Sequence, residues 1–450
     1  MEDTENFAMK IPEKSPSLDA LLARFSGGDS RSFAEFLAAP YSDDRYFSYE
    51  DLKRRPLPPF ARDADEWWLK IQIARQGKFR ELPLRDTVGA PFRYFVDDAD
   101  SAVLHELDFR GGGIIECAET LPNPRESARY LVSSLMEESI ASSLLEGAPT
   151  TREKAKEMLR RNRAPRDEGE RMVLNNYNTM LKLKTWKDEP LTPELICRIH
   201  AEISAGTMKP GAEGRFRTAD EKISVGDDFG NEFYVPPAAE LLPERMAALC
   251  AFAGDEGEGR FLHPVVKAIV LHFWLAYEHP FCDGNGRTAR ALFYWFLMKK
   301  GYWVCEYISI STAIRKAGLR YYRAFLDVEN NGNDLNYFIK FHLEILRRAV
   351  AEFLDYVEKR RWERTTLSEE FRRLDALNSR QKTLLESWLR HPHRSRETDA
   401  RAYQTEHGVS RESARQDLGD LVKRGLAVRR RDGRAFVFVP APDFEARLSS

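Results

Sequence analysis

The feature that most constrains the fold is a twelve-residue polar run enclosed by two apolar stretches. One apolar stretch, Val265 to Tyr277, precedes the run, and the other begins at its last residue and extends from Arg290 to Met298. Both stretches have the apolar character of a buried helix. The run itself begins at His279 and holds two glycines, one carboxylate and two arginines. We therefore predict a helical core in which a polar loop opens a helix.

The chemistry of this loop favours an anion with a metal ion beside it. Gly284 and Gly286 let the backbone turn sharply, and the free N–H groups at a helix start attract negative charge. Arg287 and Arg290 are three residues apart, so both side chains can reach the same anion. Asp283 offers a carboxylate oxygen of the kind that Mg²⁺ prefers.

His279 adds a base to this loop, because an ordinary histidine has a pKa near about 6.5 and accepts a proton at neutral pH. A plainer interpretation is a glycine-rich helix cap with a structural histidine. That interpretation accounts for the glycines, but it leaves Asp283, Asn285 and the two arginines unexplained.

The run from His279 to Arg290 resembles the signature of the Fic/DOC family, HPFx(D/E)GNGRxxR, at every fixed position. The resemblance implies a mainly α protein with a Fic-type helical core, which transfers AMP from ATP to a Ser, Thr or Tyr hydroxyl of a target protein. His279 would be the general base and Asp283 the Mg²⁺ ligand. The implied nucleotide-binding residues are Gly284, Asn285, Gly286, Arg287 and Arg290, with Tyr322 at the adenine. For Tyr322, core packing is the alternative.

A second element, upstream, resembles the inhibitory helix of the same family. A helix predicted from about 124 to 147 ends in a segment that fits (S/T)xxxE(G/N), with Ser142, Glu146 and Gly147 at the fixed positions. The resemblance implies that Glu146 pairs with Arg290 and prevents it from ordering the γ-phosphate of ATP. The alternative is an ordinary helix that ends in Glu and Gly. Some family members with this layout also remove AMP, and the sequence leaves that activity open.

Residues 214–237 predict a β-hairpin. Two strand-like runs, Lys222–Val225 and Glu232–Val235, enclose a segment rich in turn-forming residues. The residues on either side resemble those around the Fic flap, which would pair with an extended segment of the target. The docking residues would then be Ile223, Ser224 and Val225. The alternative is a surface hairpin without a binding role.

The rest of the chain divides into an N-terminal accessory region at 1–110, a Fic region at 111–365 and a C-terminal domain at 378–442. In the last of these, helices at 379–389, 398–406 and 410–424 followed by a hairpin at 427–439 resemble a winged helix-turn-helix. Its third helix and hairpin carry basic residues that would neutralise phosphates: Arg411, Arg415, Lys423, Arg424, Arg429, Arg430, Arg431 and Arg434. Acidic residues offset half of them: Glu412, Asp417, Asp420 and Asp432. Contact with DNA, contact with protein or a second copy, and no partner at all remain open.

Composition sets limits on the class of protein. The net charge of −2 over 450 residues argues against a protein that coats nucleic acid along its whole length. No apolar run reaches the roughly 18 residues that a membrane span needs, and the acidic start has no signal-peptide pattern. The five cysteines are scattered without a CxxC pair, which favours a reduced, cytoplasmic protein.

Three functions follow from these observations. The first is an AMP transferase held inactive by Glu146. The second keeps the fold but changes the donor to UMP, phosphocholine or phosphate; the intact Asp283 and both arginines of the loop favour ATP instead. The third is a transcription regulator that uses the winged helix and only senses nucleotide, and the intact His279 argues against it.

Overall fold

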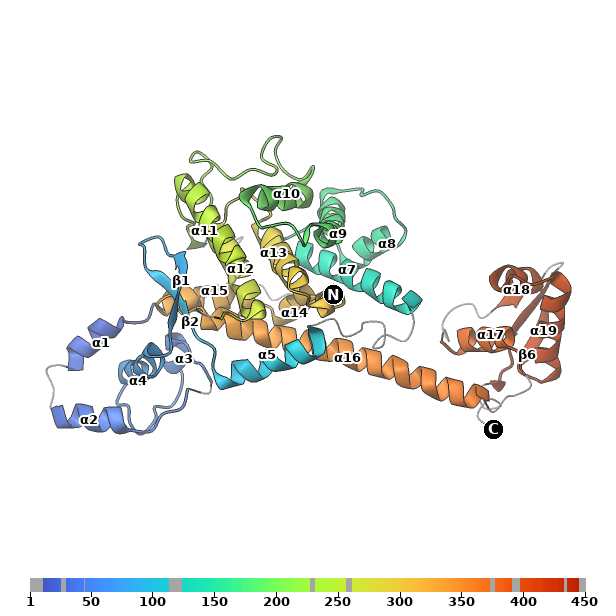
Figure 1. Cartoon of the computed structure of the whole chain (residues 1–450), viewed down its shortest axis with the longest axis horizontal. Helices are drawn as coiled ribbons and strands as arrows, with labels where there is room; N and C mark the ends of the chain where they lie inside the picture. Colours follow the sequence, from blue (N-terminus) through green and yellow to red (C-terminus); the bar gives the residue numbers. More distant parts are fainter. Residues whose placement is uncertain are drawn as a thin grey trace. The chain divides into compact units, whose positions relative to one another are not determined.

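The structure, a computed structural model, describes residues 11–25, 30–43, 45–112, 124–226, 231–255, 261–372, 377–390, 397–432 and 435–444. These residues form mainly α-helices, with small antiparallel sheets (Figure 1). Two compact units divide the chain, Met1–Leu354 and Asp355–Ser450. None of the described helices combines the length and the apolar content that crossing a membrane requires.

The centre of the first unit is a pair of helices, α12 (Pro264–Glu278) and α13 (Asn285–Lys299), which pack along each other (Figure 1). Almost all of their side chains are buried, because further helices cover them on several sides. Four of those helices are α7 (Pro124–Leu145), α9 (Glu168–Trp186), α10 (Pro193–Ser204) and α11 (Leu242–Gly254). Both predicted apolar helices are present, but α13 begins at Asn285, five residues before its apolar stretch, so the second half of the polar run is helical.

Further helices complete the first unit. Several begin at a side chain that accepts a hydrogen bond from the helix start; one is Thr151, whose hydroxyl accepts from the Lys154 amide at 3.3 Å. These helices are α1 (Leu18–Phe25), α2 (Ser30–Ala38), α3 (Tyr49–Leu52), α4 (Ala64–Gln76), α5 (Asp98–Gly111), α8 (Arg152–Arg160), α14 (Ile310–Ala317) and α15 (Arg320–Asn330), with the 3-10 helices η1 (Ala239–Leu241) and η2 (Trp303–Glu306). A long helix, α16 (Asn336–Arg372), begins in the first unit and ends in the second.

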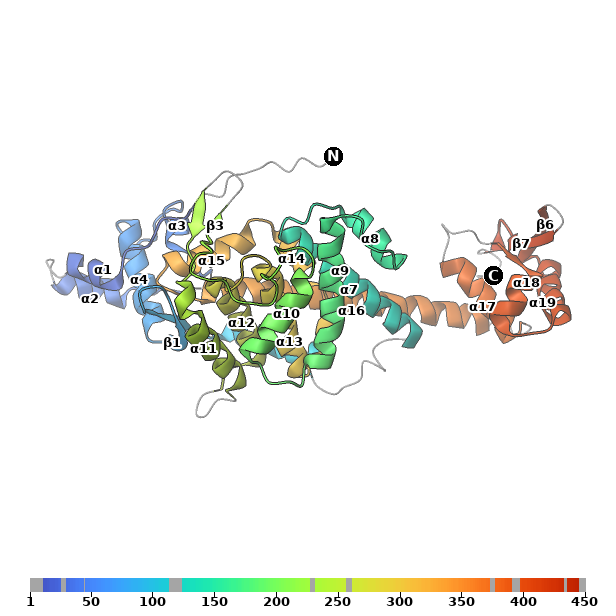
Figure 2. The ribbon, with the colours of Figure 1, turned by 90° about the horizontal axis from the view of Figure 1, so that it is seen from above.

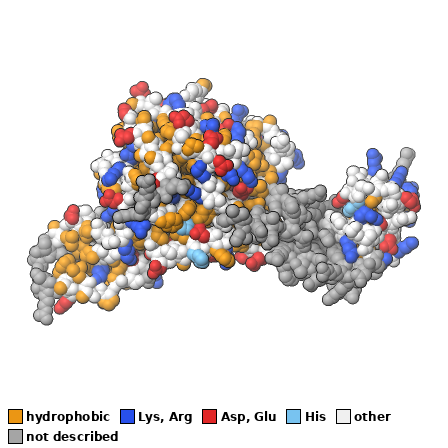
Figure 3. All heavy atoms as spheres, in the orientation of Figure 1, with side chains coloured by type: hydrophobic (Ala, Val, Ile, Leu, Met, Phe, Trp, Pro, Cys, Tyr) orange, Lys and Arg blue, Asp and Glu red, His pale blue; other side chains and the backbone are white. Residues whose placement is uncertain are grey.

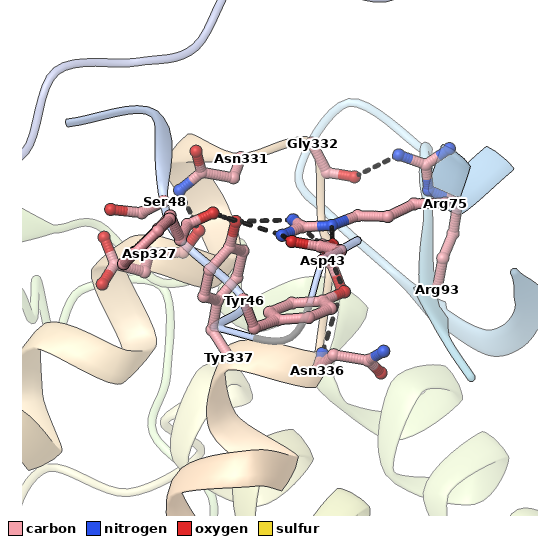
Figure 4. Close-up of polar contacts among 12 residues, drawn as sticks. Asp43, Tyr46, Ser48, Arg75, Arg93, Asp327, Asn331, Gly332, Asn336 and Tyr337 are labelled. Atoms are coloured by element: carbon pink, nitrogen blue, oxygen red, sulfur yellow. Dashed lines mark hydrogen bonds and ion pairs between the residues drawn. The ribbon is translucent and has the colours of Figure 1, made fainter. Parts of the chain in front are cut away.

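A buried polar cluster ties the N-terminal residues to the loop between α15 and α16 (Figure 4). Arg75, in α4, is 1% exposed; its Nε donates to Asp43 at 2.6 Å and its Nη1 donates to the Tyr337 hydroxyl at 2.8 Å. The Tyr46 hydroxyl donates to Asp334 at 2.6 Å, and the Arg75 guanidinium lies 3.7 Å from the Tyr46 ring centroid. The predicted accessory region and the predicted Fic region therefore belong to one compact unit.

Two hairpins accompany these helices. Strands β1 (Arg80–Arg85) and β2 (Pro91–Tyr94) form one antiparallel hairpin. Strands β3 (Val225–Gly226) and β4 (Glu232–Tyr234) form the other, which projects from the helical body in Figure 2. The first strand of the predicted flap is shorter than expected: Ile223 and Ser224 precede it, because Val225 already pairs with Tyr234, the last residue of β4. The predicted turn at 227–230 lies outside the described residues.

The second unit has a small core of its own, built around Leu385, Trp388, Tyr403 and Leu418. Its elements lie where the sequence predicts three helices and a hairpin. They are α17 (Ser379–Arg390), β5 (Thr398–Asp399), α18 (Ala400–His407), α19 (Arg411–Lys423), β6 (Ala427–Asp432) and β7 (Ala435–Pro440), with the strand order β5-β7-β6.

The charges of α19 are divided between the core and the surface. Asp417 is 7% exposed and accepts from Arg380 at 2.8 Å, and Asp420 accepts from Arg424 at 2.8 Å. Two of the acids expected to offset the basic face are therefore engaged in local ion pairs. Six arginines of α19 and the residues that follow it are exposed: Arg411, Arg415, Arg424, Arg429, Arg430 and Arg431. Figure 3 shows both basic and acidic side chains on the described surface of each unit.

Candidate active site

His279 ends α12 in a left-handed conformation, with φ 47° and ψ 55°. This region costs roughly 1–2 kcal/mol for a residue with a Cβ, although histidine is among the residues that visit it more often. The ring Nδ1 lies 3.3 Å from the Ala276 carbonyl oxygen, which can only accept, so the neutral ring carries its proton on Nδ1. Burial lowers the pKa of His279. The ring is therefore neutral at neutral pH, and Nε2 retains a lone pair that can accept a proton.

The loop after His279 is closed by its own amide side chain. Gly284 is the N-cap of α13 and has φ +78°, a conformation that suits glycine. The Asn285 Oδ1 accepts from the Phe281 amide at 2.9 Å, and its Nδ2 donates to the Phe281 carbonyl at 2.8 Å. The Asn285 side chain therefore holds the loop, and contact between Asn285 and a nucleotide stays a prediction.

Asp283 and Arg287 form the outer edge of the loop. The Asp283 side chain is 55% exposed, and its Oδ2 lies 3.0 Å from Nη2 of Arg287, whose own side chain is buried. Among the described residues, no group of three His, Cys, Asp or Glu side chains converges on a metal site. One exposed carboxylate fits Mg²⁺, which is usually held by one or two carboxylates together with water and phosphate oxygens.

Arg290 is held by the end of α7, more than 140 residues earlier in the chain. Its guanidinium is 1% exposed; Nε donates to the Ser142 hydroxyl at 2.9 Å, and Nη2 donates to the Ser142 carbonyl at 2.9 Å and to Oε1 of Glu146 at 3.1 Å. We call these three bonds the inhibitory contact, after the role that the family resemblance implies for Glu146. The structure pairs Glu146 with Arg290, as the family resemblance implied, and Ser142 adds two bonds to Arg290 that were not predicted.

The backbone at the end of α7 fixes the position of Glu146. Gly147 has φ +75°, its amide donates to Leu144 at 3.2 Å, and the Ala148 amide donates to Ser143 at 3.0 Å. This is the pattern of a Schellman motif, with Glu146 as the last residue before the glycine. The Glu146 carboxylate lies against Gly286, where an added Cβ would be 2.1 Å from Oε1. It therefore sits on the first turn of α13, where an anion is favoured.

Tyr322 lies beside this contact. It is 38% exposed, and its hydroxyl donates to the Leu145 carbonyl at 3.2 Å. The alternative of core packing is therefore wrong for Tyr322; its neighbour Tyr321 is the buried one and lies 3.0 Å from Nε2 of His272. Contact between Tyr322 and adenine stays a prediction.

Sequence reasoning missed His200, in α10, which touches the loop from the opposite side. Its Nδ1 accepts from the Gly214 amide at 3.0 Å, so Nε2 carries the proton and donates to the Asp283 carbonyl at 2.9 Å. The ring stacks on Phe281 with 3.7 Å between centroids, and burial lowers the pKa of His200 to about 4. The available signal was a polar residue on an apolar helix face, directly after Ile199 and three residues before Ile203.

Comparison with known proteins agrees with this geometry. Residues 190–297 match the Fic/DOC family. The chain carries a Fic/DOC domain. The matched residues include α10, α11, α12, the loop at 279–290 and most of α13.

The relatives and the fold extend this finding. The chain is 33% identical over 168 residues to the protein adenylyltransferase Fic of Nematostella vectensis, a match that covers 37% of this chain and 35% of the relative. It is 29% identical over 168 residues to that of Culex quinquefasciatus, covering 37% and 30%. The chain thus spans about a third of the length of these relatives. Its fold is similar to the crystal structure of a Fic family protein from Desulfovibrio desulfuricans G20, with a TM-score of 0.54 and 19% identity over 76% of this chain and 94% of that one.

Proposed function

We propose that the protein is an adenylyltransferase that moves AMP from ATP to a hydroxyl of a target protein, and that the inhibitory contact holds it inactive. The observation that carries the proposal is the position of Glu146. Its carboxylate lies on the first turn of α13 and pairs with Arg290, the cation expected to bind the γ-phosphate. A neutral histidine lies on the same loop, at the end of the neighbouring helix.

The reaction assigns a distinct task to each residue. Nε2 of His279 takes the proton of the target hydroxyl, whose oxygen forms a bond to the α-phosphorus of ATP. The bond from that phosphorus to the bridging oxygen breaks, and pyrophosphate leaves. The start of α13 and Arg287 neutralise the phosphates, because such transfers depend mainly on positioning and on charge stabilisation. A positioned base adds roughly 10²–10⁴-fold in rate.

Asp283 is the proposed Mg²⁺ ligand. Mg²⁺ supplies charge neutralisation at the phosphates when it is bound. The residue's own contribution is an exposed carboxylate that Arg287 orients from α13. Because Arg287 is buried and fixed, this ion pair also determines where the Asp283 oxygens lie.

In the inhibited state, Arg290 has its hydrogen bonds directed to α7 instead of to ATP. ATP then lacks the cation that orders its γ-phosphate, and the α-phosphorus is not aligned for attack. The Glu146 carboxylate also repels a phosphate from the same helix start. The same carboxylate would orient a water molecule in AMP removal, an activity that this proposal leaves open.

A labelling assay tests the proposal. The wild-type chain, Glu146→Gly and Glu146→Gly/His279→Ala are incubated with α-labelled ATP and Mg²⁺ and resolved by gel and intact mass. We expect AMP to appear on protein with Glu146→Gly and to vanish in the double variant. ATP labelled at the γ-position separates AMP transfer from phosphate transfer. Label from γ-ATP, or no label although ATP binds, contradicts the proposal.

The remaining parts of the proposal concern partners and setting. The segment at 214–237, with Val225 in β3, would dock an extended target segment by strand pairing. The C-terminal unit would act as a winged helix that contacts DNA, another protein or a second copy of the chain. A cytoplasmic setting is part of the proposal, and the four described cysteines are free thiols.

A further inference from the structure

Arg217 ties the catalytic loop to the base of the proposed flap. Its side chain is 8% exposed. Nε donates to the His279 carbonyl at 2.9 Å, Nη2 donates to the Pro237 carbonyl, and the Arg217 amide donates to the Pro280 carbonyl at 2.8 Å. Arg217 thus joins both ends of the flap segment, residues 214–237, to His279 and Pro280, the first two residues of the loop.

The partners of Arg217 suit a cation at this position. They are carbonyl oxygens, and among the described residues no carboxylate forms an ion pair with this guanidinium. The His279 carbonyl lies at the C-terminal end of α12, where carbonyls lack helical partners and the helix dipole is negative. Arg217 therefore satisfies the helix end and binds the flap with the same group.

The bond to His279 acts on a strained residue. A non-glycine residue in an unfavourable backbone region costs roughly 1–3 kcal/mol and persists only where its surroundings hold it. Arg217 fixes the carbonyl of His279, while the His279 amide donates to Leu275 at 3.1 Å. The peptide groups on both sides of the catalytic imidazole are thus held.

A second tie runs parallel to the first. Gly214, at the start of the flap segment, donates to His200, and His200 donates to the Asp283 carbonyl. The flap segment is therefore attached to the loop at two places, through His200 and through Arg217.

We propose that Arg217 is a positioning residue for AMP transfer, which fixes the backbone of His279 relative to the flap on which the target docks. The inference rests on the proposed function and deepens it. Without Arg217, the imidazole of His279 and the target hydroxyl would no longer be held at fixed positions relative to each other. The start of α13, which receives ATP, would stay intact.

The test compares Arg217→Gln and Arg217→Lys in the Glu146→Gly chain. We expect Arg217→Gln to lower the transfer rate by about 10²-fold, the cost of misplacing reacting groups by about an ångström, with ATP affinity changed by less than about twofold. Lysine keeps the charge but cannot reach two carbonyls as a fork does. Because the charge is kept, Arg217→Lys should leave the acid limb of the pH–rate profile unchanged. Because the fork is lost, it should recover only part of the transfer rate.

Arg198→Gln is the matched control. Arg198 lies on α10, two residues before His200, and forms a surface ion pair with Glu189 at 45% exposure. The same change of side chain there should leave transfer unaltered. Thermal melts of all variants identify any that unfold.

Hydrogen exchange of the segment 277–284 gives a readout that needs no transfer. We expect faster exchange of this segment in Arg217→Gln and not in Arg198→Gln. A normal rate and normal exchange in Arg217→Gln overturn the inference, and so does a rate loss matched by an equal loss of ATP affinity. If the parent Glu146→Gly transfers no AMP, the proposed function fails, and the exchange result alone decides whether Arg217 holds the loop.

Discussion

Replacing Glu146 by glycine removes one bond of the inhibitory contact and leaves the other two. Arg290 keeps its bonds to the hydroxyl and carbonyl of Ser142, both at 2.9 Å, and loses the bond to Oε1 of Glu146 at 3.1 Å. The Arg290 guanidinium is 1% exposed and the Glu146 side chain 23%, so solvent screens this bond only partly. The expected result is a rise in AMP transfer without a change in fold.

The size of the rise follows from the strength of that bond. A hydrogen bond to a charged group contributes about 1.5–3 kcal/mol net, which is about 10- to 150-fold in the ratio of closed to open states. If the wild-type chain is closed for about 99% of the time, the open fraction rises about 10- to 60-fold. Ser142→Ala removes only the hydroxyl bond, whose acceptor is neutral; its contribution lies at the lower end of this range, about 1.5 kcal/mol, and the rise should be about 10-fold.

Initial rates with α-labelled ATP, at several ATP concentrations, measure this effect. Glu146→Gln serves as the control, because it keeps the shape and an acceptor oxygen but loses the charge, and its rate should lie between those of wild type and Glu146→Gly. Equal rates for wild type and Glu146→Gly, at equal ATP occupancy, would refute the reasoning. A rise in Ser142→Ala larger than in Glu146→Gly would place the control of Arg290 on the hydroxyl instead.

Three further predictions follow from charge and packing. The transfer rate of Glu146→Gly should fall in acid with a midpoint below about pH 6.5, because burial lowers the pKa of His279 and only the neutral ring accepts a proton; a midpoint above that value contradicts this account. The pKa of His200 is about 4 in the folded chain and about 6.5 in the unfolded chain. The neutral ring therefore contributes on the order of 3 kcal/mol to the free energy of unfolding above pH 6.5, and this contribution is lost as the pH falls toward 4. Urea titrations of wild type and His200→Asn across that range should differ in slope against pH, and parallel curves would exclude it. Gly286→Ala should lower the free energy of unfolding of the wild-type chain, because the added Cβ displaces the Glu146 carboxylate. In the Glu146→Gly background the same change should raise that free energy by about 0.4–1 kcal/mol. Denaturation of wild type, both single variants and the double variant gives the sign, and a decrease in both backgrounds contradicts the clash.

The parts of this protein that could be predicted are those written into adjacent residues. The loop from His279 to Arg290 carries its own turn, charges and helix start, so its residues and their neighbours follow from local spacing. The end of α7 was also predictable, because Glu146 followed by Gly147 marks a helix end. Family resemblance supplied the long-range pairing of Glu146 with Arg290, which no local pattern contains.

Contacts between distant segments account for what the sequence did not reveal. His200 and Arg217 lie 83 and 62 residues from their partners in the loop, and neither stands in a short motif with them. Arg75 meets Asp334 across 259 residues, so the attachment of the N-terminal residues to the loop before α16 has no signal in composition. The first flap strand was predicted too long because alternating residues cannot show where the opposite strand ends.

The place of Glu146 just after the last helical residue, Leu145, has a consequence for temperature. Helix ends open locally at a free energy far below that of the whole unit. Opening of the last turn would carry Glu146 away, while Ser142, one turn earlier, still bonds Arg290. In the proposed mechanism, the strength of inhibition is then set by the stability of a single helical turn. Warming should therefore raise basal AMP transfer at temperatures well below the melting of the unit.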